Sequence, residues 1–137
     1  MQLECLPSIH GALALKIGDV GRAITALAAA APYELGHWNS SFTFGMYPVY
    51  LRGVAYLAEK RGGEAISEFH KILDHPGVAG NQPIGGLAHL GLARGYVLQG
   101  DTAKAKTAYQ DFLTIWKDAD PDVPILKEAK AEYAKLQ

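Results

Sequence analysis

The chain has few of the residues that mark a disulfide scaffold, a membrane span or a nucleic-acid surface. Cys5 is its only cysteine, so no disulfide can form within the chain. No apolar run approaches the ~20 residues that a membrane helix needs. Thirteen basic and fourteen acidic residues leave a net charge of -1, whereas a phosphate-binding surface needs an excess of Lys and Arg. We therefore expect no membrane insertion and no nucleic-acid partner.

The N-terminus also lacks the basic region, apolar core and small-residue cleavage site of a signal peptide. With the single cysteine, this favours a cytoplasmic location. Hydrophobic residues make up 49% of the 137 residues and charged residues only 20%, which argues against disorder. We expect one folded domain over residues 1–137.

A short pattern occurs three times along the chain, as GDVGRA, KRGGEA and GDTAKA at 18–23, 60–65 and 100–105. Each copy is typical of a tight turn between two helices. In the first and third copies a glycine can adopt the left-handed conformation that ends a helix. The following Asp19 or Asp101 can accept hydrogen bonds from the first amides of the next helix. In the middle copy we expect Gly62 or Gly63 to make the turn.

Small residues recur at a fixed distance before each turn. Each pattern ends in an alanine that follows another small residue by twelve positions (23−11, 65−53 and 105−93), which gives the pairs Gly11 and Ala23, Gly53 and Ala65, and Ala93 and Ala105. Apolar residues lie four and seven positions after each alanine, on one face of a helix. Because small residues let two helices approach closely, the pattern predicts three helical hairpins that stack to bury their faces.

The repeat period separates two kinds of helical array. The alanines are 42 and 40 residues apart (65−23 and 105−65), while tetratricopeptide units have about 34 residues and HEAT units about 40–47. The constant spacing of twelve favours the tetratricopeptide unit, with the surplus in Gly- and Pro-rich connectors at 36–48 and 74–83. We expect helices at 7–17, 20–31, 47–60, 63–73, 83–98, 102–117 and 124–137, the last capped by Asp122.

Two long segments carry a family resemblance: YPVYLRGVAYLAEKRGGEAISEFHKILDHPG at 47–77 and PIGGLAHLGLARGYVLQGDTAKAKTAYQDFLTIWKDADPDVPILKEAKAEYAKL at 83–136. They resemble the tetratricopeptide repeat (TPR) family, and within it the C-terminal repeat region of certain bacterial serine/threonine protein kinases and related signalling proteins. The resemblance implies an all-α, right-handed α-solenoid of three TPR-like hairpins plus a capping helix. The repeats would lie at about 5–35, 46–77 and 83–118, and the capping helix at about 122–137.

The resemblance also implies a function. TPR domains bind a protein or peptide partner in a concave groove lined by the first helix of each pair, and in this group the repeats are attached to an effector domain. In some members they lie beyond a membrane helix, which would place them outside the cytoplasm. Carried over by position, the groove would present Tyr47, Tyr50, Val54, Leu87, Leu90 and Arg94.

Two arginines in this region need an explanation. Arg52 stands where the family usually has leucine, and Arg94 is the lone charge of the predicted groove. Both lie in apolar helical contexts and require a carboxylate or solvent. We favour internal ion pairs, with Glu34, Glu64 or Glu68 as partners, over direct contact with a ligand.

The connector between the first two hairpins is aromatic for a loop, with Trp38, Phe42 and Phe44. It either folds back over the groove and packs against Tyr47 and Tyr50, or it docks a second subunit, with Arg52 at the same interface. The alternative function is therefore a structural homodimerisation module whose groove is filled by the chain itself.

The remaining polar residues suggest no chemistry. No two of the five histidines have the i, i+3 or i+4 spacing of helix-borne metal ligands. Ser40 and Ser41 lack the strand–turn–helix elbow of a nucleophile. We expect no catalytic residue, metal or cofactor, and a scaffold that binds a protein or peptide.

Overall fold

The computed structural model describes residues 2–35, 46–79 and 82–137. Within these ranges every regular element is an α-helix, so the chain is all-α as predicted. None of the described helices is both long and apolar enough to cross a membrane. The helices are α1 (Gln2–Lys16), α2 (Val20–Ala28), α3 (Tyr47–Ala58), α4 (Gly62–Asp74), α5 (Pro76–Ala79), α6 (Ile84–Gln99), α7 (Thr102–Ile115) and α8 (Pro124–Ala134).

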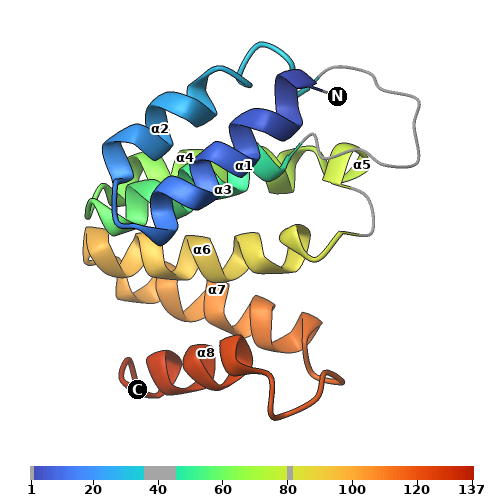
Figure 1. Ribbon diagram of the computed structural model, residues 1–137. Helices are drawn as coiled ribbons and strands as arrows, with labels where there is room; N and C mark the ends of the chain where they lie inside the picture. The colour runs from blue at the N-terminus through green and yellow to red at the C-terminus, as the bar shows by residue number, and fades with distance from the viewer. Residues whose placement is uncertain (1, 36–45, 80–81) are drawn as a thin grey trace.

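The longer helices pack as pairs that follow one another in chain order (Figure 1). Helix α1 packs on α2, α3 on α4, and α6 on α7. Helix α3 also contacts α1 and α2, α6 contacts α3 and α4, and α8 contacts α7. The arrangement therefore has α1 and α2 at one end and α8 at the other.

The predicted helix positions differ from the structure mainly at their ends. Helix α1 begins at Gln2, so Pro7 lies inside it and does not start it. Helix α2 ends at Ala28, and turns follow where the helix was predicted to continue. The short helix α5 lies in the region 74–83, which was predicted to be a loop.

The first and third turns have the predicted conformation. Gly18 and Gly100 have φ angles of 79° and 75°, in the left-handed region. The side chain of Asp19 accepts a hydrogen bond from the Arg22 amide, and that of Asp101 accepts one from the Lys104 amide, each at 3.1 Å. Similar sequences have thus produced the same helix stop and the same N-cap.

The middle turn is different, and the prediction for it was wrong. The left-handed residue is Lys60, with φ 61°, and not Gly62 or Gly63. Gly62 is already the first residue of α4. A Cβ atom there would lie 2.8 Å from the Gly95 carbonyl oxygen of α6. The glycine therefore permits a close approach of α4 to the backbone of α6.

The repeated small residues lie where the helices of a pair meet. Ala23, Ala65 and Ala105 are all fully buried. A Cβ atom on Gly11 would lie 2.5 Å from the Leu27 side chain, so α1 and α2 meet at this point. Leu27 is fully buried, so its side chain has little room to move away from such an atom.

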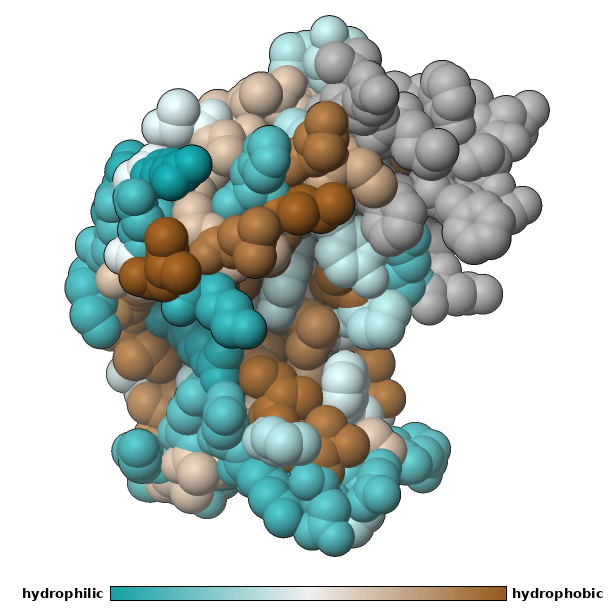
Figure 2. Space-filling model, in the orientation of Figure 1, coloured by the Kyte–Doolittle hydropathy of each residue, from teal (hydrophilic) through white to brown (hydrophobic). Residues whose placement is uncertain are grey.

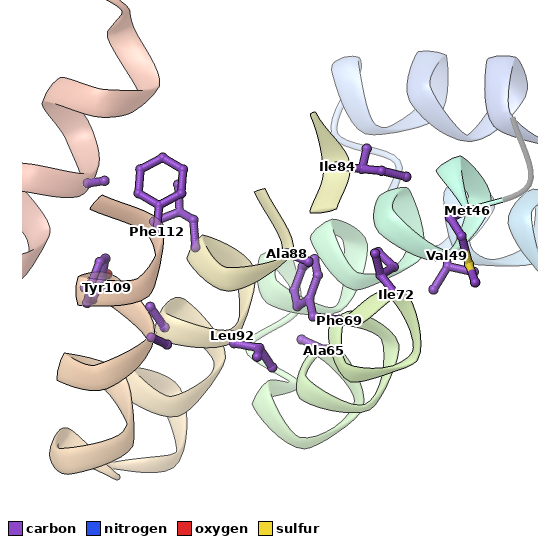
Figure 3. Close-up of a cluster of buried hydrophobic side chains, with 14 of the residues drawn as sticks. Met46, Val49, Ala65, Phe69, Ile72, Ile84, Ala88, Leu92, Tyr109 and Phe112 are labelled. Carbon is purple, nitrogen blue, oxygen red and sulfur yellow. The ribbon is translucent and has the colours of Figure 1, made fainter. Parts of the chain in front are cut away.

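A cluster of buried hydrophobic side chains surrounds Phe69 of α4, whose ring is fully buried (Figure 3). A Cβ atom on Gly53 of α3 would lie 2.7 Å from the tip of this ring, and one on Gly91 of α6 would lie 2.4 Å from it. The two glycines thus let three helices converge on one aromatic side chain. The cluster also contains Ile72, Ile84, Ala88, Leu92, Tyr109 and Phe112.

Helix α8 covers the last pair through Leu126 and Ala129, which are 3% and 0% exposed. The predicted cap was wrong: Val123 is the N-cap and makes no side-chain capping bond. The carboxylate of Asp122 instead forms an ion pair with Lys127 at 2.7 Å.

We predict opposite effects for two glycine-to-alanine changes in α6. Gly91→Ala should destabilise the chain by about 1–3 kcal/mol, because the buried Phe69 ring leaves no room for a Cβ atom. Gly85→Ala is the control, since nothing lies within 4 Å of its Cβ position, and alanine favours a helix. Urea denaturation measures both. Equal stability of the two variants would contradict the packing described for Phe69.

Candidate functional site

A hollow of about 320 Å³ lies at the C-terminal ends of α3, α6 and α8, which are on the same side of the molecule (Figure 1). We call it the α3–α6–α8 hollow. Its lining is Leu57, Lys60, Arg94, Val97, Leu98, Tyr109, Glu132, Lys135 and Leu136. Val97 and Leu98 are 43% and 37% exposed. Apolar side chains thus form an open wall beside several charges.

Glu132 of α8 is the centre of the polar part of the hollow. Arg94 donates from Nε to Oε2 at 3.0 Å and from Nη2 to Oε1 at 2.9 Å, a bidentate pair. The Tyr109 hydroxyl donates to Oε2 at 2.8 Å. Glu128 lies one turn away and accepts a bond from Arg94 at 3.3 Å. These bonds hold α8 against both α6 and α7.

The protonation states follow from this geometry. Burial opposes the ionisation of Glu132, but the bonds from Arg94 and Tyr109 outweigh it and lower the pKa of the carboxyl. Burial and the bond to Glu132 raise the pKa of Tyr109, which stays a neutral donor. Lys60, Arg94 and Lys135 against Glu132 leave the lining with an excess of two positive charges (three minus one). The hollow can therefore receive an apolar group that has a carboxylate beside it.

The structure places the six predicted groove residues in three kinds of environment. Arg94 lines the hollow. Leu90 is only 2% exposed and belongs to the core, so it offers no surface to a partner. The other four are partly buried and pack against the core cluster: Tyr47, Tyr50, Val54 and Leu87.

Tyr50, one of the predicted groove residues, packs against the core in this way. Its ring meets Phe69 edge-on, with centroids 6.0 Å apart. Burial raises the pKa of its hydroxyl, against the opposing effect of Arg94. The sequence argument missed Leu57 and Val97, which are three positions after Val54 and Arg94. Helical spacing alone puts them on the same face and could have identified them.

Arg52, considered above as an interface residue, points into the molecule. Its side chain is 6% exposed and donates to Glu34 at 2.6 and 3.0 Å and to Glu68 at 2.7 Å. It also donates to the Leu27 carbonyl oxygen at 3.2 Å. The predicted internal ion pair is therefore present with two of the three suggested carboxylates. The third, Glu64, pairs with Arg61 instead.

Glu34 is fully buried and is neutralised from two sides. Lys71 of α4 donates to its Oε2 at 2.6 Å, in addition to the bonds from Arg52 of α3. Burial opposes its ionisation, but these bonds outweigh that effect and lower its pKa. The bonds of Glu34 to Arg52 and Lys71 hold the turns after α2 against α3 and α4. Glu34 has a structural position and is not part of the hollow.

The aromatic connector residues Trp38, Phe42 and Phe44 lie outside the described residues, as do Ser40 and Ser41. Among the residues that are described, no group of three or more His, Cys, Asp or Glu side chains could hold a metal ion. His70 bonds to the Tyr96 hydroxyl at 3.0 Å, and His75 to the Lys71 carbonyl oxygen at 2.8 Å. The chain matches no protein-family model, no curated protein and no solved structure.

We predict that Arg52→Leu costs about 3–5 kcal/mol of stability, because it leaves the buried Glu34 with Lys71 as its remaining cation. Arg61→Leu is the matched control: Arg61 also contacts two carboxylates, but its side chain is 45% exposed, so the unfolding midpoint should change little. Urea denaturation compares the two variants. Similar losses would mean that burial does not distinguish the two arginines.

We also predict a dependence on pH that originates at Glu34. Its pKa is lower in the folded chain than in the unfolded one, so its stabilisation is present above the unfolded pKa of about 4.3. It is lost as the pH falls from there through the folded pKa. Thermal melts between about pH 6 and pH 3 should show a shallower loss for Glu34→Gln than for the unchanged chain. Parallel curves would assign the acid sensitivity to other carboxylates.

Proposed function

We propose that the chain is a non-enzymatic TPR-type scaffold that binds a protein or peptide partner. In this proposal the stacked helix pairs form a right-handed α-solenoid of three hairpins closed by α8. The matching turns at Gly18 and Gly100 support it, as do the buried alanines at 23, 65 and 105. Fixed small residues and repeated turns are the features by which such arrays stack.

The α3–α6–α8 hollow is the observation that carries this function. All of its lining residues but Tyr109 come from α3, α6 and α8 or from the residues that directly follow these helices. Helices α3 and α6 are the first helices of their pairs, which line the concave groove in TPR proteins, and α8 is the closing helix. The proposed binding site is therefore nearer the helix C-termini than Tyr47 and Tyr50.

The hollow also suggests the chemistry of the partner. Leu57, Val97 and Leu136 would bury an apolar side chain, which supplies the affinity. Lys60 and Lys135 would attract a carboxylate next to it, which supplies orientation and speeds association. Arg94 is already bound to Glu132 and would shape the floor of the site. We infer that the partner segment has an apolar residue flanked by Asp or Glu.

We further propose that the scaffold is the interaction region of a bacterial signalling protein. The resemblance of residues 47–77 and 83–136 to the repeat regions of such proteins supports this assignment. A binding surface on stacked helices is what a region attached to an effector domain would contribute.

We predict that selection from a random peptide library displayed on phage will enrich an apolar residue next to Asp or Glu. Amide NMR shifts on adding the enriched peptide should change most at Leu57, Val97 and Leu136. Val97→Asp should weaken binding at least about tenfold, because a new carboxylate would replace the apolar wall and repel the ligand. Fluorescence anisotropy of a labelled peptide measures this loss.

A charge reversal provides the matched comparison. Lys60→Glu should weaken binding several-fold and should lessen its dependence on salt. Lys117→Glu should do neither, because Lys117 is an exposed lysine beyond α7 that does not line the hollow. Enriched peptides without acidic residues, or shifts confined to other helices, would contradict the proposed site.

A further inference from the structure

Helix α1 has a second apolar face that points away from its own partner helix. Leu6, Ile9 and Leu13 of α1 are 46%, 52% and 57% exposed, and Ile17, the residue that follows the helix, is 73% exposed. Their spacing of three, four and four residues places them in one row, opposite the side where Gly11 meets Leu27 of α2. Figure 2 shows hydrophobic surface running along α1. We call this row the α1 stripe.

The stripe continues into a hollow of about 390 Å³ between α1 and α2. Leu13, Ala14, Ile17 and Ala26 supply its apolar walls, and His10, Lys16 and Arg22 complete the lining. This hollow shares no residue with the α3–α6–α8 hollow. It lies at the end of the molecule that α1 and α2 form, away from α8.

The two ends of the molecule differ in polarity. At the far end, α8 exposes Lys127, Glu128 and Lys130. At the near end, α1 exposes the apolar stripe, although a helix that is apolar on opposite faces normally lies between other elements. Contact between α8 of one molecule and α1 of another would strip water from these charges, and the apolar stripe offers no polar group in its place. Contact between two α1 stripes buries mainly apolar side chains.

We propose that the α1 stripe binds the α1 stripe of a second copy of this chain, in a dimer with two-fold symmetry. In an antiparallel arrangement Leu6 lies opposite Ile17, and Ile9 opposite Leu13. The residue numbers within these two pairs sum to 23 and 22, so the midpoint of each pair falls near residue 11. One two-fold axis at that point therefore relates both pairs. The stripe is therefore complementary to itself, as the shared patch of a two-fold dimer must be.

The charges beside the stripe select the antiparallel direction. A parallel pair would place Lys16 beside Lys16 of the second copy. In the antiparallel pair the two lysines lie at opposite ends, about 14 Å apart along the helix axis from the rise of 1.5 Å per residue. That separation exceeds the screening length of about 8 Å at physiological salt. The like charges then do not oppose association.

The size of the surface sets the strength of the dimer. A single helix face is a small surface compared with the ~800 Å² per partner of a standard interface. We therefore expect a weak, reversible dimer. The two hollows share no residue, so the dimer leaves the α3–α6–α8 hollow open to the proposed partner.

Sedimentation equilibrium of the full chain tests the dimer. From about 1 to 500 µM the apparent mass should rise from one chain towards two. Ile9→Glu should keep the mass at one chain throughout. Ile115→Glu is the matched control: Ile115 is 55% exposed, close to the 52% of Ile9, but lies on α7, so this variant should still dimerise. Circular dichroism should show the same helix content for both variants.

Two other results would overturn the proposal. One is a single-chain mass at every concentration, which would assign the stripe to another protein or to a further segment of a longer chain. The other is a dimer that survives Ile9→Glu or is lost in Ile115→Glu, which would place the interface elsewhere.

Disulfide trapping tests the direction of the two helices. In a Cys5→Ser background, chains with Ile9→Cys are mixed with chains with Leu13→Cys and oxidised. The antiparallel arrangement predicts more cross-linked dimer in the mixture than in either variant alone, because positions 9 and 13 face each other. Equal or lower yield in the mixture would overturn this arrangement.

Discussion

The tip of the Phe69 ring determines how closely the central helices approach one another. Gly53 of α3 and Gly91 of α6 both converge on it, at distances that leave no room for a Cβ atom. The fully buried ring therefore sets the spacing of α3, α4 and α6 together. Since α3 and α6 also form two sides of the α3–α6–α8 hollow, the shape of the candidate site depends on this contact. A dense core transmits such constraints because its side chains have no space to rearrange.

Two arginines join successive helix pairs, in opposite directions along the chain. Arg52 directly precedes the small residue of α3 and binds Glu34, which lies upstream, after α2. Arg94 directly follows the small residue of α6 and binds Glu132, which lies downstream, in α8. Relative to the small residue the two arginines are two positions apart, and two residues along a helix turn a side chain by about 200°, which accounts for the two directions. The first arginine is buried and contributes to stability, whereas the second lines the open hollow.

The sequence predicted contacts that recur at short range, and it failed where distant helices meet. Equal spacing was enough to identify Ala23, Ala65 and Ala105 as buried, and a Gly-Asp pair was enough to predict two turns. The role of Gly62 was misinterpreted because the contact that requires a glycine there is with the backbone of α6, more than thirty residues away. Glu132 was missed because no local pattern shows that α8 aligns it with Arg94. For the same reason the predicted groove residues, other than Arg94, do not line the hollow.

The close approach of Gly62 to the backbone of α6 has a mechanical consequence. Backbone atoms cannot yield as side chains do, so sliding between α4 and α6 would force a clash at the Gly95 carbonyl. The junction of the second and third pairs is therefore stiff. The packing between α4 and α6 is also more extensive than that between α2 and α3 or between α7 and α8. We therefore expect elastic compliance to be greater towards the two ends than at the centre.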